Sequence, residues 1–182
     1  MQSLKKIVVI GPESTGKSTL CEALALHYQT KWVPEYAREF LLTNGNVYTY
    51  NDLLTIANGQ IALEDEVCLT INDQRSTLIF IDTDMYVMKV WCEFVFAKCH
   101  QWIIDQIVER NYDLYILCNT DLPWVKDELR EYPDLETREK LFHIYKDIMV
   151  NQKTSWVEIR GIHENRMQLA IEAVDLLLKK NH

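Results

Sequence analysis

The stretch Gly11-Pro12-Glu13-Ser14-Thr15-Gly16-Lys17-Ser18 fits the pattern G-x-x-x-x-G-K-[ST]. It directly follows the apolar run 7–10 and opens a segment of helical periodicity over about 17–29. Glycines in such a loop let successive backbone N–H groups point at phosphate oxygens. The helix that follows directs the positive end of its dipole at the same anion. The stretch therefore predicts a phosphate-binding loop between a strand and a helix.

The motif also assigns roles to individual side chains. Lys17 is expected to reach the β- and γ-phosphates of a nucleoside triphosphate, and the Ser18 hydroxyl to ligate Mg²⁺. Thr15 and Thr19 add hydroxyl donors. The sequence thus predicts ATP and Mg²⁺ as ligands. The residues expected to bind them in this loop are Gly11, Glu13, Ser14, Thr15, Gly16, Lys17, Ser18 and Thr19.

Outward from the loop, short apolar runs alternate with longer segments of helical periodicity, which is typical of βαβ units on a parallel sheet. Strands are expected over 7–10, 31–34, 78–81, 112–118 and 156–160. Helices are expected over about 17–29, 36–43, 51–73, 85–97, 100–110, 134–152 and 164–179. The predicted fold is α/β, a three-layer sandwich with a five-stranded parallel sheet of the P-loop kinase type. We expect one domain over 1–182, with a lid at about 121–138.

Composition narrows the class of partner. The net charge of −8 and the pI of about 5.1 argue against a broad basic surface for nucleic acid. No apolar stretch reaches membrane-spanning length, and the run 7–10 is too short for a secretory signal. The five cysteines are odd in number without a CxxC pair, so reduced thiols are favoured over disulfides or zinc. These features predict a cytoplasmic protein that binds neither nucleic acid nor membrane. They do not decide between a monomer and a homo-oligomer.

An acidic pair follows the apolar run 78–81. Asp82 and Asp84 stand two residues apart at the end of that predicted strand, where ligands collect in open α/β folds. A carboxylate there can hold magnesium or its waters. The alternative is that either residue caps the following helix.

The end of the second predicted strand carries Glu35, Tyr36 and Arg38. In P-loop kinases this position faces the phosphoryl acceptor. Glu35 is suited to accept a hydroxyl proton or to bond a ribose diol, and Arg38 to stabilise transferring charge. The alternative is a surface Glu–Arg pair of little energetic value.

A polar connection after the fourth predicted strand carries the candidate lid residues Trp124, Arg130 and Arg138. A lid excludes water, which would otherwise compete for the phosphoryl group. Surface arginines paired with nearby glutamates are an equally good interpretation of Arg130 and Arg138. Trp124 fits either a base-stacking platform or a core anchor. The aromatic-rich run 85–102 is interpreted as a packed helix rather than a cofactor site.

Five segments together resemble one family: GPESTGKSTL at 11–20, VPEYAR at 33–38, FIDTD at 80–84, YDLYILCNTDLPWVKDELR at 112–130 and GIHENR at 161–166. The chain resembles the nicotinamide riboside kinase domain of bacterial NadR-type proteins, a branch of the P-loop NMP-kinase-like enzymes. The resemblance spans nearly the whole chain. Its P-loop is generic, whereas the other segments in this order are much more specific.

The resemblance implies ATP-dependent phosphorylation of the ribose 5′-hydroxyl of nicotinamide riboside, which yields nicotinamide mononucleotide for NAD synthesis. It implies Glu35, Asp82 and Asp84 near the riboside and metal, Arg130 and Arg138 in the lid, and the segment ending at Arg166 near adenine. NadR-type proteins also carry an adenylyltransferase domain, and some a DNA-binding domain; the chain has neither motif, so neither activity is expected.

Two rival functions stay open on the sequence alone. One is a kinase for a different small metabolite. The other is an ATP-hydrolysing regulatory module that acts on a protein partner. The acidic pair, Glu35 and the predicted lid favour a kinase, because a switch needs no acceptor pocket.

Overall fold

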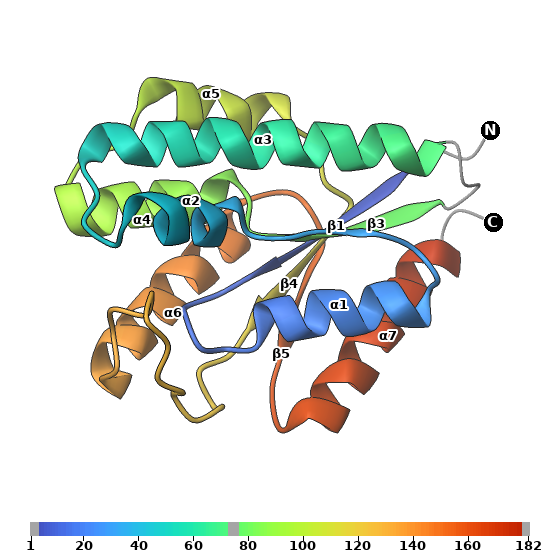
Figure 1. Ribbon diagram of the computed structural model, residues 1–182. Helices are drawn as coiled ribbons and strands as arrows, with labels where there is room; N and C mark the ends of the chain where they lie inside the picture. Colours follow the sequence, from blue (N-terminus) through green and yellow to red (C-terminus); the bar gives the residue numbers. More distant parts are fainter. Residues whose placement is uncertain (1–3, 73–76, 180–182) are drawn as a thin grey trace.

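A computed structural model describes residues 4–72 and 77–179, and the predicted α/β fold is confirmed. Five strands form one parallel sheet in the order β2-β3-β1-β4-β5 (Figure 1). The strands are β1 (Lys5–Ile10), β2 (Trp32–Val33), β3 (Leu78–Asp82), β4 (Leu114–Cys118) and β5 (Trp156–Ile159). The helices are α1 (Lys17–His27), α2 (Tyr36–Asn44), α3 (Tyr50–Asn72), α4 (Met85–Phe96), α5 (Gln101–Glu109), α6 (Leu135–Asn151) and α7 (His163–Lys179).

Every predicted strand and helix lies where the pattern placed it, within a few residues at each end. Residue 73, the expected last residue of the long third helix, lies outside the described residues. No described helix is long and apolar enough to cross a membrane.

Alternate residues of the central strands pack on opposite faces of the sheet, as the pleat requires. Val9 and Phe80 lie in the core under α1 and α7, whereas Val8 and Ile81 face α3, α4 and α6. A third apolar cluster packs α2, α3, α4 and α5 against one another. Figure 1 shows α1 and α7 on one side of the sheet and α3, α4 and α5 on the other. Both faces are covered, which explains why β3 and β4 are apolar throughout.

Because all strands are parallel, their carboxyl ends meet at one edge. That edge receives the loop 11–16 after β1, Glu35 after β2, Thr83 after β3, and the long connection 119–134 between β4 and α6. The segments that the sequence singled out therefore converge there.

Candidate active site

The loop after β1 has the geometry that its glycines predict. Gly11 lies so close to β4 that a Cβ atom there would stand 2.7 Å from the Cys118 carbonyl oxygen. Gly16 takes the left-handed conformation (φ 76°) at the start of α1, and no side chain caps that helix. The helix N-terminus is thus left to serve an anion. The Lys17 ammonium and the Thr15 hydroxyl both donate to the Pro12 carbonyl, at 2.9 and 2.8 Å.

Ser18, in the first turn of α1, meets Asp82, the last residue of β3. The Ser18 hydroxyl donates to Asp82 Oδ2 at 2.5 Å, and Asp82 is fully buried. Burial, reinforced by the nearby Glu35 charge, raises the pKa of Asp82 to about 7. The other oxygen of this carboxyl, Oδ1, is buried with no hydrogen-bond partner among the described residues. An unpartnered buried carboxylate oxygen is costly in a folded protein unless a ligand takes it up.

This donor set fits a magnesium ion. A hydroxyl and a carboxylate are hard oxygen ligands, and Mg²⁺ commonly takes only one or two from the protein. Within residues 4–72 and 77–179 no group of three His, Cys, Asp or Glu side chains could hold a metal ion. Phosphate oxygens and water would therefore complete the coordination.

Glu35 and Arg38 line the same cleft as the loop, on the β2 side. Thr83, between the two strand-end aspartates, donates to Glu35 Oε1 at 3.4 Å. The Arg38 guanidinium pairs with Asp127 of the long connection at 3.1 Å, and its side chain is half-exposed. Glu35 is thus near the Ser18–Asp82 pair, while Arg38 is engaged with the predicted lid.

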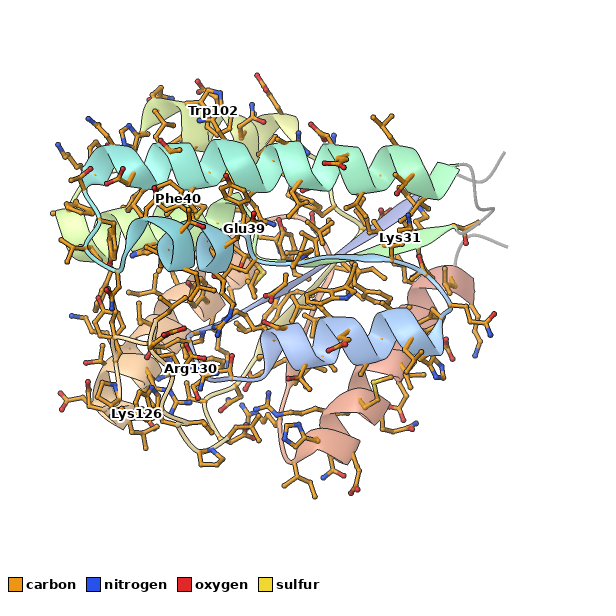
Figure 2. All side chains as sticks on the ribbon, in the orientation of Figure 1. Lys31, Glu39, Phe40, Trp102, Lys126 and Arg130 are labelled. Atoms are coloured by element: carbon orange, nitrogen blue, oxygen red, sulfur yellow. The ribbon has the colours of Figure 1, made fainter. Side chains whose placement is uncertain are left out.

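The connection 119–134 folds over the phosphate-binding loop and is attached to it mainly through Glu13. The Glu13 carboxylate accepts hydrogen bonds from Trp124 Nε1, the Glu131 amide and the Tyr132 amide at 3.1, 2.9 and 2.8 Å. The Val125 amide adds a bond to the Ser14 hydroxyl at 3.0 Å. Figure 2 labels Arg130 and Lys126 on this segment, and Arg130 lines the cleft.

Arg138 and Arg166, two arginines that were expected to bind the ligand, donate hydrogen bonds to backbone carbonyls of the phosphate-binding loop. Arg138 is buried and donates to the Ser14 and Leu122 carbonyls at 3.3 and 3.2 Å. Arg166 is buried and donates to the Thr15 carbonyl at 2.8 Å, and it also bonds Asn119, Asp121 and Gly161. Their guanidinium groups fix the backbone of the loop and of the connection.

Three other predicted site residues do not join the cleft. Asp84 accepts bonds from the Tyr86 and Val87 amides at the start of α4 and from the Tyr115 hydroxyl at 2.8 Å. Its alternative role as a helix cap is therefore the one that the contacts describe. Burial raises the pKa of Asp84 to about 7. Tyr36 packs against α3, and Trp124 points at Glu13.

The cleft itself has a volume of about 340 Å³, and part of its wall is apolar. Sequence reasoning missed this wall, because the aromatic-rich run appeared to be core. The signal was present: Val87, Val90, Trp91 and Phe94 recur at helical spacing on one face of α4. The remaining apolar and aromatic lining comes from Trp32, Pro34, Ala37, Leu41, Leu129, Tyr132, Leu141 and Tyr145.

A phosphate-binding loop at a helix N-terminus, beside a strand-end carboxylate on a parallel sheet, defines a P-loop nucleotide-binding protein. A family model described as an AAA domain matches residues 6–166, and the chain belongs to that family.

The chain is also similar to the trifunctional NAD biosynthesis/regulator protein NadR. It is 27% identical to the Escherichia coli (strain K12) protein and 26% identical to that of Salmonella typhimurium, each over 176 residues. The match covers 94% of this chain but 42% of either relative, so the chain spans less than half the length of these NadR proteins.

Solved structures share the fold. A NadR protein in complex with NR superposes with a TM-score of 0.76 at 22% identity, over 94% of this chain and 48% of that one. A NadR protein in complex with NAD and AMP-PNP gives 0.68 at 22% identity, with the same coverage. The thymidylate kinase of Ehrlichia chaffeensis gives 0.66 at 13% identity, over 96% and 99% of the two chains.

Proposed function

We propose that this chain uses ATP and Mg²⁺ to phosphorylate the 5′-hydroxyl of a nucleoside, and that nicotinamide riboside is the acceptor. The observation that carries the proposal is the shared cleft: the phosphate-binding loop, Ser18 and Glu35 line one space, and Ser18 is hydrogen-bonded to the buried Asp82. The relatives support the choice of ligands, because NadR structures hold NR in one case and AMP-PNP in another.

The loop and the start of α1 would hold the triphosphate through backbone amides, with Lys17 as a point charge beside it. When bound, Mg²⁺ on Ser18 and Asp82 supplies charge neutralisation of the phosphates. Lys17 now rests on the Pro12 carbonyl, a weak anchor that a phosphate oxygen would replace. Little covalent chemistry is required of the protein, because phosphoryl transfer depends chiefly on positioning and electrostatics.

Glu35 is the carboxylate placed to receive the acceptor. It lines the cleft, whereas Asp84 is committed to the α4 N-terminus and Tyr115. In the proposed reaction Glu35 orients the 5′-hydroxyl and takes its proton as the oxygen attacks the γ-phosphorus, while the bond from that phosphorus to the β,γ-bridging oxygen breaks and ADP leaves. Arg130, also in the cleft wall, would stabilise charge on the transferring group.

The apolar wall suits a flat, uncharged or cationic ring on the acceptor. Trp32, Trp91 and Phe94 line the cleft together with Tyr132 and Tyr145. Aromatic side chains supply large contact area and stacking faces for such a ring. This arrangement supports a nucleoside as the acceptor.

The test is an acceptor screen with the purified chain. ADP release would be coupled to absorbance across nicotinamide riboside, deoxynucleosides and other nucleosides, and the phosphorylated product identified by ³¹P NMR. We expect magnesium-dependent product with nicotinamide riboside and a much lower kcat/KM with the others. ADP release that no nucleoside accelerates would contradict the proposal and favour an ATP-hydrolysing module. Lys17→Ala serves as the inactive control.

A further inference from the structure

Gln60, in the middle of α3, is a buried amide that bonds two strand ends at once. It is 1% exposed. Its Oε1 accepts the Tyr36 amide at 2.7 Å, and its Nε2 donates to the Pro34 and Asp82 carbonyls at 3.3 and 3.4 Å. The orientation of the side-chain amide follows from these partners, because an N–H needs the oxygen and two carbonyls need the nitrogen.

Two of the three bonded groups flank Glu35. The Pro34 carbonyl belongs to the peptide unit before Glu35, and the Tyr36 N–H to the unit after it. Holding both units fixes the two backbone dihedrals of Glu35, which are φ −68° and ψ 111°. Since these dihedrals set the direction of the Cα–Cβ bond, Gln60 fixes the direction in which the Glu35 side chain leaves the backbone.

The third bonded group belongs to the other strand end. The Asp82 carbonyl starts the peptide unit that leads into Thr83. Thr83 has φ 78°, a left-handed conformation that is strained for a β-branched residue. Such a conformation persists only where surrounding contacts hold it, and its hydroxyl bonds Glu35. The Gln60 amide is one of those contacts.

Gly59 explains how α3 comes close enough to make these bonds. A Cβ atom at Gly59 would lie 2.1 Å from Cε1 of the Tyr36 ring, so the ring packs directly on the helix backbone. Helices α2 and α3 pack against each other, and Figure 1 shows them side by side. Gly59 and Gln60 therefore hold the turn that carries Glu35: Gly59 by contact with the Tyr36 ring, and Gln60 by its hydrogen bonds.

We propose that Gln60 is a positioning residue, which sets Glu35 against the Ser18–Asp82 pair by bonding the backbone on both sides of Glu35 and at Asp82. This inference rests on the proposed function, in which Glu35 meets the acceptor hydroxyl. Gln60 itself touches neither the cleft nor the phosphate-binding loop.

Two variants separate the bonds. Gln60→Leu removes all three bonds, while Gln60→Glu keeps an oxygen for the Tyr36 amide but sets another against the Pro34 and Asp82 carbonyls. We expect kcat with nicotinamide riboside to fall about 10- to 100-fold in Gln60→Leu, and less in Gln60→Glu, because small misplacements of a reacting group are costly. KM for ATP should stay within about twofold, since the loop is untouched.

Asn58→Asp is the matched control. It makes the same amide-to-carboxylate change one helical position before Gly59, at an exposed site. Thermal unfolding of each variant checks that the fold is retained. A control with wild-type kcat, beside a reduced kcat in Gln60→Glu, supports a local effect at Gln60.

Hydrogen exchange of the Tyr36 amide tests the bond without any acceptor. Tyr36 is the first residue of α2, so its N–H has no partner within the helix and depends on Gln60 for protection. We expect slow exchange in the wild type and Gln60→Glu, and fast exchange in Gln60→Leu. Retained protection in Gln60→Leu would show that Gln60 does not hold the Tyr36 amide, and would refute the proposal.

The remaining outcomes are distinct. Lost protection in Gln60→Leu with an unchanged kcat overturns the positioning role and leaves the kinase proposal standing. A wild-type chain that phosphorylates no nucleoside overturns the proposed function, whereas Tyr36 exchange still decides whether Gln60 holds the turn.

Discussion

At the scale of single residues, the acidic side chains at the strand ends differ in their hydrogen-bond partners and in whether they line the cleft. Asp82 has one oxygen with no hydrogen-bond partner among residues 4–72 and 77–179, and Glu35 lines the cleft. Both oxygens of Asp84 accept hydrogen bonds within the fold. The sequence placed Asp82 and Asp84 at the end of the same predicted strand, where they can share one site, with helix capping as the alternative for either residue. It could not tell them apart, because the deciding contact comes from Tyr115 on another strand.

Lys17→Ala tests the loop. Removing the ammonium takes away a charge placed beside the proposed triphosphate, and turnover should fall by at least about a hundredfold. Circular dichroism should show an unchanged fold, because the one hydrogen bond that the Lys17 side chain makes among the described residues is to the Pro12 carbonyl of its own loop. The coupled ADP assay measures the effect, and full activity in this variant would refute the nucleotide site.

Replacing the acids one at a time separates their roles. Asp82→Asn and Glu35→Gln should each lower kcat by about two orders of magnitude or more, since they touch the proposed metal and acceptor. Asp84→Asn should stay within a few-fold of wild type, because asparagine also caps helices. A large loss in Asp84→Asn with normal stability would return Asp84 to the list of reacting groups.

At the scale of elements, the sequence predicted the helices, the strands and the existence of the connection 119–134, because each depends on local periodicity and turn residues. Where that connection lies depends on contacts across the chain. Glu13 and Trp124 are 111 residues apart, and no local pattern pairs them. The burial of Arg138 and Arg166 could not be predicted for the same reason, because it depends on contacts with residues that are distant in the sequence.

Glu13→Ala should release the connection from the loop. It removes the acceptor for three N–H groups at both ends of the segment, at Trp124, Glu131 and Tyr132. We expect faster proteolysis within 121–134 and a larger share of ATP lost to water relative to transfer. The matched change Glu128→Ala, at an exposed glutamate of the same segment, should leave both unchanged. Equal proteolysis rates in the two variants would show that Glu13 does not hold the connection against the loop.

At the scale of the whole molecule, the buried carboxyls make folding depend on pH. Burial raises the pKa of Asp84 to about 7, above its value of about 4 in an unfolded chain. Between those values the folded protein binds more protons than the unfolded chain. Stability from this group is therefore greatest below about pH 4 and declines as pH rises to about 7.

Asp84→Asn removes the contribution of Asp84 to that dependence. At pH 8 without magnesium, the variant should be more stable than wild type by on the order of 2 kcal/mol, because no buried charge must form. At pH 5 the advantage should shrink. Urea unfolding at the two pH values measures both differences, and parallel stability curves would show that Asp84 is not the group responsible.

The Arg166 contact with the Thr15 carbonyl joins residues 151 positions apart. During synthesis the loop 11–16 leaves the ribosome before α7, which carries the guanidinium that supports it. A nascent chain that stops short of α7 therefore has the loop without its support. At the proposed ATP site, nucleotide would stabilise only chains in which α7 has been made, so it acts on the folded domain and not as a template for its folding.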